Sequence, residues 1–592
     1  MCGISSILSL NDDIMNDLIF SLERLEYRGY DSAGIAYLGT NSKLYRERAV
    51  GKIENLKEVV EKLNVKSNIG IGHTRWATHG KVTELNAHPH VCDGVAVVHN
   101  GIIENYQELK DKLITEGYVF ESETDTEVIS KLIAFHIKGG ENFQSAFSSS
   151  LSKFVGTYAI VAICENEPNI LLGAKMGSPM AIGLSNDQQN FHIASDAVAL
   201  SSLTDKVTYL EEGDIVVAEK GKNLNYEIFN LNGEKVARDA IPNVVSLNDI
   251  NQNGYESFML KEIFEEVIVA KNTYDRFNCD IDIFKFRGIS IIACGTSYYA
   301  GLLAKYWIED IARIPVNVEI ASEFRYKNPI LPKDSLYVFV SQSGETIDTL
   351  CAMRLVKEAH INTVALVNVN NSSIAREADY VIQTVAGTEI GVASTKVFIS
   401  QILSMLLMCV KKDSVDITTI EKNINIVLNK QHEFARIAEK IKNSRSLFYI
   451  GRGTNYPLSL EGALKIKELS YISAEGHPAG EIKHGPIAIV DESVHTIAIA
   501  PLDKHFKKTL SNSQEIFARN GKILLITTEN ARNLVSDFDK GDIDYIFLPN
   551  SDPLYYPFSI TTAIHLVAYY TAKLKGGDVD KPRNLAKSVT VE

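Results

Sequence analysis

The stretch SIIACGTSYYAG, residues 290–301, decides the fold of the longer part of this 592-residue chain. A continuous apolar run ends there in a small polar loop and leads into a helical pattern, as in a strand of a parallel sheet. The stretch LFYIGRGTNYPLS, residues 447–459, repeats the pattern. Alternating strands and helices follow both stretches. The sequence therefore predicts two copies of one α/β unit, each a doubly wound parallel sheet, produced by internal duplication.

The first 220 or so residues follow a different pattern. Short β-like runs such as VAVVHNG and TYAIVAIC are separated by turn residues and by two helix-like stretches, near Met15–Leu25 and Thr126–His136. This arrangement predicts an α+β domain with layered sheets.

Composition narrows the class of protein. The net charge of −14 lacks the basic footprint of a nucleic-acid-binding protein. We find no apolar run of the length that a membrane helix needs and no secretory signal, so neither nucleic acid nor membrane is an expected partner. The seven cysteines are odd in number and never form a CxxC pair. Free thiols in a reducing cytoplasm are the expectation.

The motif SQSGET lies where a strand ends and a helix begins. Helix N-termini expose unpaired N–H groups, and hydroxyls with a glycine beside them form an anion cradle. Without the lysine of a P-loop, the motif favours a monophosphate over a nucleoside triphosphate. A simple Ser/Thr helix cap is the alternative. Ser297 follows another strand at the same sheet edge, which favours the ligand. The second repeat has APLDKH instead, so we expect one phosphate site per chain.

The segment LEGALKIKELS places Glu461, Lys465 and Glu468 on one helical face. A solvated row of salt bridges is the alternative. The helix, however, begins at the ligand edge of the second sheet, where a carboxylate near a lysine can transfer protons. His484, in the nearby turn GEIKHGP, is a second acid–base candidate.

In the N-terminal domain, GHTRWATHG places Arg75 beside Trp76 in a glycine-bounded loop, which favours binding of a small carboxylate. Asn100 and Gly101 follow an apolar strand, a suitable place for an oxyanion donor pair. Asp125 stands at a helix start, where it is either a cap or a ligand.

Four histidines, His73, His79, His88 and His90, crowd the same region. A metal cluster is one interpretation, but the spacing of cysteines and carboxylates does not support it, and we expect no metal.

Cys2 stands directly behind Met1. Removal of Met1 leaves an α-amino group, with a pKa of about 7.7–8.0, beside the thiol. Such an amine serves as the base for its own side chain, the N-terminal-nucleophile arrangement. A small buried residue is the alternative.

Together these residues resemble the family of glutamine–fructose-6-phosphate aminotransferases (isomerising), or glucosamine-6-phosphate synthases. The resemblance covers nearly the whole chain through MCGI, HTRWATHG, VVHNGIIENY, SETDTEV, SQSGETIDT, EGALKIKELSYI, GEIKHGP and DKPRNLAKSVTVE. It implies an α+β N-terminal-nucleophile (αββα) glutaminase domain followed by two α/β doubly wound sugar-isomerase (SIS) domains. The implied ranges are 2–218 for a type 2 glutamine amidotransferase domain, 219–284 for a linker with a helix, 285–424 and 440–575 for the SIS domains, and 576–592 for a tail entering the synthase site.

The resemblance also implies an activity. D-Fructose 6-phosphate and L-glutamine would give D-glucosamine 6-phosphate and L-glutamate, the first step of amino-sugar synthesis, with ammonia passing through an internal channel. No pyridoxal phosphate or other cofactor is expected, because the amide nitrogen travels as ammonia. The family implies a homodimer or a higher homo-oligomer.

Roles carry over residue by residue. The implied catalytic residues are Cys2, Asn100, Gly101, Glu468, His484 and Lys587. The implied glutamine-binding residues are Arg75, Trp76, Thr78, His79, His88 and Asp125. The implied sugar-phosphate-binding residues are Ser297, Ser341, Gln342, Ser343, Thr346, Glu461 and Lys465.

Within these sets, Trp76 would gate the channel and His484, lent by a neighbouring subunit, would open the sugar ring. Lys587 would form a Schiff base with the open ketose, and Glu468 would move the proton from C1 to C2.

One departure concerns the linker. Glu266 and Val267 stand where the family commonly has Gln-Pro, and loss of the helix breaker lets the linker helix run on. Two alternatives remain open. Another N-terminal-nucleophile amidotransferase would need loops absent here, such as SGGxDS, and a non-catalytic sugar-phosphate sensor would have no use for Cys2, Glu468 or Lys587.

Overall fold

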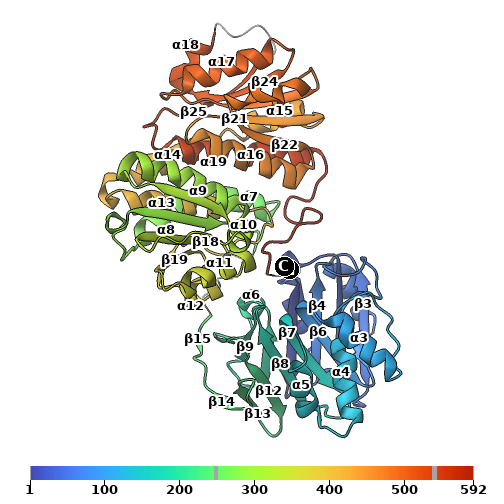
Figure 1. The fold of residues 1–592 in the computed structure, drawn as a ribbon. Helices are drawn as coiled ribbons and strands as arrows, with labels where there is room; N and C mark the ends of the chain where they lie inside the picture. The colour runs from blue at the N-terminus through green and yellow to red at the C-terminus, as the bar shows by residue number, and fades with distance from the viewer. Residues whose placement is uncertain (1, 64, 244, 246–250, 537–542, 591–592) are drawn as a thin grey trace. The chain divides into compact units, whose positions relative to one another are not determined.

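The computed structural model describes residues 2–63, 65–243, 245, 251–536 and 543–590. Two compact units make up the chain, Met1–Ile250 with Ala586–Glu592 and Asn251–Leu585 (Figure 1). Met1, whose removal we expect, lies outside the described residues, as do residues 244 and 246–250 of the expected linker and 591–592 of the tail.

The first unit contains two sheets. One has the strand order β15 (Ile241–Pro242), β11 (Lys206–Tyr209), β9 (Ala181–Leu184), β10 (Asn190–Ala194), β1 (Gly3–Ser9), β4 (Ser67–Arg75), β2 (Ser32–Gly39) and β3 (Leu44–Val50). The other has the order β14 (Lys235–Val236), β13 (Leu224–Phe229), β12 (Ile215–Lys220), β8 (Ile170–Met176), β7 (Gly156–Cys164), β6 (Val95–Ile103) and β5 (His90–Cys92). Neighbouring strands pair antiparallel, for example β1 with β4 and β6 with β7.

Helices cover the outer faces of both sheets. Helices α1 (Met15–Glu23) and α2 (Ile53–Glu61) pack on the first sheet, and α3 (Tyr106–Thr115), α4 (Glu127–Lys138) and α5 (Phe143–Leu151) pack on the second. A third apolar core lies between the sheets and includes Leu8, Val98 and Val161. The short α6 (Ala197–Leu200) lies near the first sheet. The predicted αββα layering is confirmed, and α1 and α4 lie where helices were expected.

The second unit contains two parallel sheets. The first has the order β17 (Val316–Ile320), β16 (Gly288–Ala293), β18 (Ser335–Ser341), β19 (Thr363–Val367) and β20 (Tyr380–Gln383). The second has the order β22 (Ser473–Pro478), β21 (Ser446–Gly451), β23 (Val494–Ile499), β24 (Lys522–Thr528) and β25 (Ile543–Leu548). The opening stretch and its repeat supply β16 and β21, which hold the same place in their sheets. This confirms the predicted duplication.

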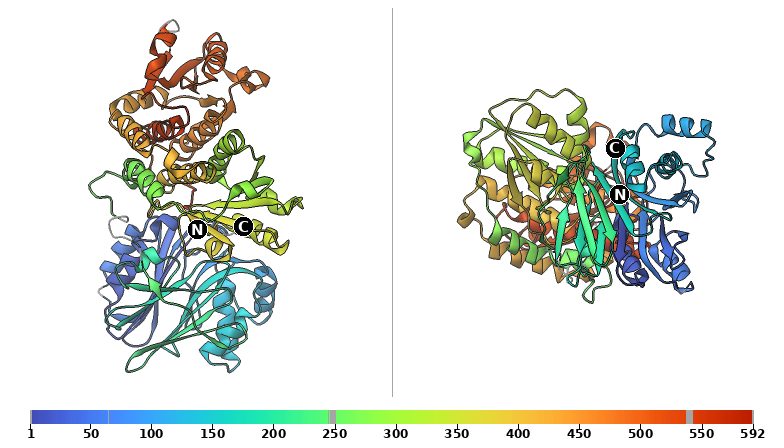
Figure 2. Two further views of the ribbon diagram at one scale, coloured as in Figure 1. Left: turned by 90° about the vertical axis from the view of Figure 1, so that its left-hand side faces the viewer. Right: turned by 90° about the horizontal axis from the view of Figure 1, so that it is seen from below.

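One continuous apolar core joins the facing sides of these two sheets, and helices lie between the sheets (Figures 1 and 2). Its helices are α7 (Phe258–Phe264), α8 (Glu266–Arg276), α9 (Gly295–Trp307), α13 (Lys396–Cys409), α14 (Ile417–Leu428), α15 (Gln431–Ile441), α16 (Asn455–Ser470) and α19 (Tyr556–Leu574). The opposite faces carry α10 (Ala321–Tyr326), α11 (Ile347–Glu358) and α12 (Ser373–Glu377) on the first sheet and α17 (Phe506–Phe517) and α18 (Arg532–Val535) on the second.

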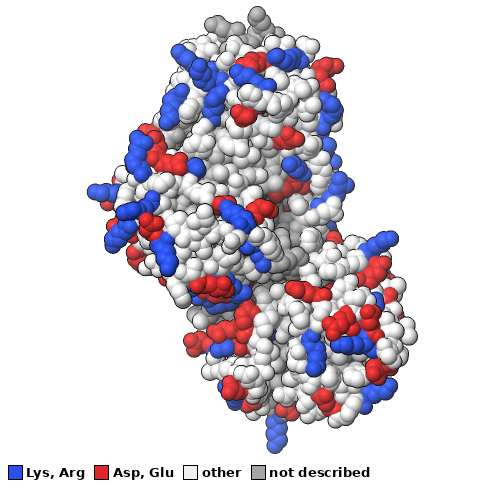
Figure 3. Space-filling view, viewed as in Figure 1, with Lys and Arg blue, Asp and Glu red and all other residues white. Residues whose placement is uncertain are grey.

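The linker helix runs on past Glu266 as far as Arg276, with one interruption at Glu265, where α7 gives way to α8. Every residue of α13 is buried, so its apolar sequence serves the core. Within the described ranges, no helix combines the length and the apolar character needed to span a membrane. On the face drawn in Figure 3, acidic and basic side chains are interspersed.

Candidate active sites

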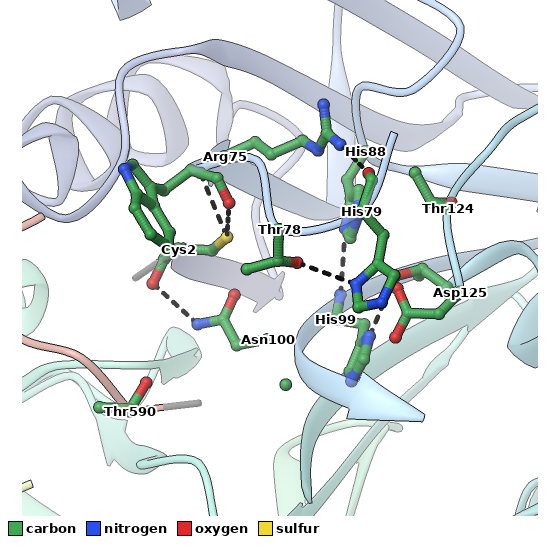
Figure 4. Close-up of a pocket in the computed structure, with 13 residues that line it drawn as sticks. Cys2, Arg75, Thr78, His79, His88, His99, Asn100, Thr124, Asp125 and Thr590 are labelled. Atoms are coloured by element: carbon green, nitrogen blue, oxygen red, sulfur yellow. Dashed lines mark hydrogen bonds between the residues drawn. The ribbon is translucent and has the colours of Figure 1, made fainter. Parts of the chain in front are cut away.

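A cavity in the first unit gathers the predicted glutamine-site residues (Figure 4). Its lining residues are Cys2, Arg75, Trp76, Thr78, His79, His88, His99, Asn100, Gly101, Thr124, Asp125, Thr126 and Thr590. Strands β1, β4 and β6 supply the core of this set, because they bring residues far apart in the sequence to one end of the two stacked sheets.

Cys2 directly precedes β1, the strand that lies between β4 and β10 in its sheet. Its Sγ accepts a hydrogen bond from Trp76 N at 3.3 Å and lies 3.4 Å from the Trp76 carbonyl oxygen. Burial raises the pKa of the Cys2 thiol. Because the thiolate is the nucleophilic form, this thiol needs a base beside it.

The side chain of Asn100 is held in one orientation. Its Oδ1 lies 3.0 Å from His73 Nε2, and its Nδ2 donates to the Cys2 carbonyl oxygen at 2.9 Å. Burial lowers the pKa of His73 to about 3, so the ring is neutral, and its Nε2–H can donate to Asn100. The amide N–H2 therefore faces Cys2, as an oxyanion donor must.

Gly101 has a φ of +135°, and a Cβ built on it would lie 2.0 Å from the Thr157 carbonyl oxygen. The neighbouring strand β7 thus leaves no room for a side chain. Glycine is required here by both backbone conformation and close approach.

We expect Gly101→Ala to reduce the kcat for glutamine hydrolysis by about 10²–10³. The added Cβ would clash with the Thr157 carbonyl oxygen and displace the Gly101 N–H, and this is the usual cost of losing an oxyanion donor. Gly140→Ala is the matched control, because Gly140 has a φ of +99° and open space around it. Glutamate release and thermal unfolding are measured for both variants. Equal activity in the two would contradict a role for Gly101 in the oxyanion site.

The remaining predicted ligands take part in a hydrogen-bonded frame. The Arg75 guanidinium donates to the carbonyl oxygens of Gly80 at 3.2 Å and Lys81 at 3.3 Å. Asp125 Oδ2 accepts from Ile103 N at 2.8 Å, and His79 Nδ1 lies 3.4 Å from Thr78 Oγ1. Arg75 thus shapes its own loop, and its contact with a substrate carboxylate stays a prediction.

Sequence reasoning missed His99, Thr124, Thr126 and Thr590 as lining residues. His99 Nδ1 lies 3.0 Å from Thr126 Oγ1, and burial lowers the pKa of His99. The position of His99 directly before Asn100 was the available signal. Thr590 gave no signal, because only the fold brings the last residues to this unit.

Three of the four histidines of the motif region contact one another, and the fourth, His79, meets the Tyr106 ring edge to face. The His73 and His88 rings stack with centroids 4.0 Å apart, and His90 meets His88 edge to face. Across the described positions, no group of three or more His, Cys, Asp or Glu side chains is arranged to hold a metal ion.

In the second unit, the SQSGET loop joins β18 to α11 at the carboxyl edge of its sheet. Ser341 Oγ lies 2.9 Å from Thr346 Oγ1 and accepts from Gly344 N at 3.0 Å. Gln342 and Ser343 lie between them and are partly exposed. Ser297 lies in the first turn of α9, after the neighbouring strand β16, and its Oγ accepts from Gln401 Nε2 at 2.9 Å. The two polar loops therefore share one sheet edge, as predicted.

Gly344→Ala is expected to raise the KM for the sugar phosphate about tenfold or more, because the loop must shift. Gly344 has a φ of +64°, and an added Cβ would lie 1.9 Å from Ser372 Oγ. Gly576→Ala is the control, since Gly576 has a φ of +72° and no atom within 4 Å of the added Cβ. Saturation curves for the sugar phosphate are compared, and equal KM values would contradict a binding role for this loop.

Helix α16 carries the predicted carboxylates and lysine. Lys465 Nζ lies 2.7 Å from Glu468 Oε2 and 3.5 Å from Glu461 Oε1. Glu461 Oε1 also accepts from Thr296 Oγ1 of α9 at 3.2 Å, next to Ser297. The Lys465 and Glu461 side chains are buried, whereas that of Glu468 is 19% exposed. The row is therefore a buried cluster beside the phosphate loop, and not a solvated face.

The last two predicted residues are His484 and Lys587. His484 ends a short 3-10 helix, Glu481–His484, and is exposed. Lys587 lies in the segment Ala586–Glu592, which belongs to the first unit, so its role at the sugar site stays a prediction.

Comparison with known proteins agrees with this division. A glutamine amidotransferase domain model matches residues 73–202, and an SIS domain model matches residues 282–411 and 440–572. The glutamine–fructose-6-phosphate aminotransferase (isomerizing) of Bartonella henselae is 44% identical over 617 aligned positions, and that of Zymomonas mobilis is 43% identical; both alignments cover all of both chains. The solved C-terminal domain of glucosamine-fructose-6-phosphate aminotransferase from Francisella tularensis is 38% identical, covers 56% of this chain and 99% of that chain, and gives a TM-score of 0.54.

The fold and these matches define the class: a glutamine amidotransferase domain followed by a tandem of SIS domains. Within this class, the full-length relatives are specific. The chain belongs to the glutamine–fructose-6-phosphate aminotransferase (isomerizing) family.

Proposed function

We propose that this chain makes D-glucosamine 6-phosphate and L-glutamate from D-fructose 6-phosphate and L-glutamine. The observation that carries the proposal is the presence, in one chain, of Cys2 in a cavity with Arg75, Asn100 and Asp125 and of a buried carboxylate–lysine cluster beside a phosphate loop. Family membership supports it throughout the chain. A non-catalytic sugar-phosphate sensor would need only the SQSGET loop and would have no use for Cys2 or for the carboxylate–lysine cluster.

In the first half-reaction, the α-amine of Cys2, freed by removal of Met1, takes the thiol proton. The thiolate then attacks the side-chain amide of glutamine, and Asn100 Nδ2 and Gly101 N–H stabilise the oxyanion. The α-ammonium group of Cys2 then gives its proton to the amide nitrogen, and collapse of this intermediate releases ammonia and leaves a thioester, which water cleaves to glutamate. Arg75 and Asp125 bind the α-carboxylate and α-amino groups, and Thr78, His79 and His88 line the site.

Ammonia must remain neutral to act as a nucleophile, and in bulk water it is mostly protonated. We therefore infer transfer of ammonia through an internal, water-poor path gated by Trp76. No cofactor enters this scheme, because nitrogen moves as ammonia.

In the second half-reaction, the phosphate of the sugar is held by the two polar loops, through Ser297, Ser341, Gln342, Ser343 and Thr346. His484, from a neighbouring subunit, opens the ring, and its exposure supports such a role. Lys587 forms a Schiff base with the open ketose, and ammonia replaces the lysine at C2. Glu468 then moves a proton from C1 to C2, with Glu461 and Lys465 fixing its position.

The proposal also includes features of the whole protein. A neighbour that lends His484 requires a homodimer or a larger homo-oligomer. All seven cysteines are free thiols, which supports a cytoplasmic location. We assign residues 2–218 to the glutaminase, 219–284 to a linker, 285–424 and 440–575 to the SIS domains, and 576–592 to the tail.

The test is direct. Purified protein is incubated with glutamine and fructose 6-phosphate, and hexosamine phosphate and glutamate are quantified. Equal amounts of both products are expected. Glutamate without hexosamine phosphate would exclude the synthase and favour a different amidotransferase, whereas neither product would favour the sensor.

A further inference from the structure

A buried charged pair lies outside the residues assigned above. Glu266 of α8 and His565 of α19 are 299 positions apart, and both side chains are wholly buried. His565 Nδ1 lies 2.7 Å from Glu266 Oε1, and Thr562 Oγ1 donates to Glu266 Oε2 at 2.6 Å. Burial of charged groups is costly unless they are paired, so this pair requires an explanation.

The other nitrogen of His565 faces the sugar site. His565 Nε2 lies 3.8 Å from Glu461 Oε1, on the carboxylate that Lys465 also contacts. Lys465 in turn contacts Glu468 at 2.7 Å. Negative and positive groups therefore alternate from α8 through α19 to α16, and end at the carboxylate assigned to proton transfer.

The charge of His565 follows from these neighbours. Burial alone would lower its pKa, but the carboxylates of Glu266 and Glu461 outweigh burial and raise the pKa of His565 to about 9. At neutral pH both ring nitrogens then carry protons. The Nδ1–H is hydrogen-bonded to Glu266, whereas the Nε2–H has Glu461 Oε1 3.8 Å away, an ion-pair distance without a hydrogen bond. The Phe398 ring meets the imidazole edge to face from α13 and adds no charge.

Glu461 is thus held from several sides. Thr296 donates to its Oε1 from α9, Lys465 lies 3.5 Å away on α16, and His565 faces it from α19. A displaced Glu461 would release Lys465, the contact that holds Glu468. A shift of about 1 Å at a catalytic group can cost about 10² in rate.

We propose that Glu266 and His565 are positioning residues for the isomerisation: a buried ion pair that fixes Glu461 and, through Glu461 and Lys465, the carboxylate of Glu468. This inference rests on the proposed function of the sugar site. It gives Glu266, which departs from the common family residue, a role as a charge partner in a linker helix otherwise remote from the chemistry.

The test compares His565→Gln, Glu266→Gln and the double variant with wild type. Each single variant leaves a buried group without its charge partner, so we expect a lower thermal unfolding temperature in both. We also expect the kcat of ammonium-dependent hexosamine phosphate synthesis to fall about 10- to 100-fold, with the KM for fructose 6-phosphate within about threefold. Glutamine hydrolysis should stay unchanged.

The double variant separates positioning from stability. Its two amides bury no unpaired charge, so thermal stability should recover, but kcat should stay low because Glu461 keeps only Lys465 and still lacks the imidazolium of His565. His495→Gln, a neutral histidine at the start of β23, is the matched control and should keep its kcat within about twofold. The pKa of His495 is about 4, lowered by burial, so this control changes no charge at neutral pH.

Two results would overturn the inference: recovery of both stability and kcat in the double variant, or kcat within twofold of wild type in all three variants. If the single variants fail to fold, the double variant decides. Absence of hexosamine phosphate from the wild-type reaction would instead overturn the proposed function itself, so the two failures are distinguishable.

Discussion

Cys2→Ala will abolish synthesis from glutamine and leave synthesis from added ammonium largely intact. Removal of the nucleophile costs at least about 10³ in glutamine hydrolysis, because no other thiol lines the described cavity to replace Cys2. The phosphate loop and the cluster of Glu461, Lys465 and Glu468 belong to a separate compact unit and do not use this thiol. Hexosamine phosphate is measured with glutamine and, separately, with an ammonium salt as the nitrogen source.

Cys92→Ala is the matched control, because Cys92 is a partly buried thiol of the same unit outside the cavity. Burial raises the pKa of Cys92 to about 11, so it is unreactive at neutral pH. A form that keeps residues before Cys2 should behave like Cys2→Ala, because its thiol lacks the neighbouring free amine. Loss of both activities in a folded Cys2→Ala protein would contradict separate sites.

Much of the fold follows from local patterns in the sequence. Strands that end in GTS or SQSGET and lead into helices predict parallel sheets. This strand–loop–helix pattern can be recognised in the sequence because it lies within a stretch of about 15 residues. The candidate residues were also predicted from local patterns: Cys2 from its place behind Met1, Asn100 from the end of an apolar strand, and Glu468 from the helical face that it shares with Glu461 and Lys465. Their spatial grouping within each unit agrees with those predictions.

The rest depends on contacts between distant segments. Nothing local to His73 shows that its Nε2 orients Asn100, because the contact forms only when β4 and β6 lie in facing sheets. The meeting of Glu266 with His565 likewise requires α8 and α19 to pack in one core. At Glu266 and Val267 the sequence showed a lost helix breaker, and the structure adds a buried charge partner for Glu266.

Glu468→Gln will abolish hexosamine phosphate synthesis from either nitrogen source while glutamine hydrolysis continues. General acid–base groups contribute about 10²–10⁴ in rate, and an amide cannot accept the C1 proton. Burial alone would lower the pKa of Lys465, but Glu461 and Glu468 raise it, so Lys465 stays protonated beside Glu468. The amide loses this ion pair as well. Initial rates of hexosamine phosphate and glutamate formation are measured for the same preparation.

Glu475→Gln provides the control, because Glu475 is an exposed carboxylate on β22 that lies 3.1 Å from His477 Nε2. It should retain synthesis within about twofold. If Glu468 transfers the proton, the Glu468→Gln variant is blocked at the isomerisation step. In deuterium oxide, the C1 hydrogen of its substrate should therefore show no exchange above background. Exchange at the wild-type rate in this variant would assign the proton transfer to another base and leave Glu468 only a structural part in the cluster.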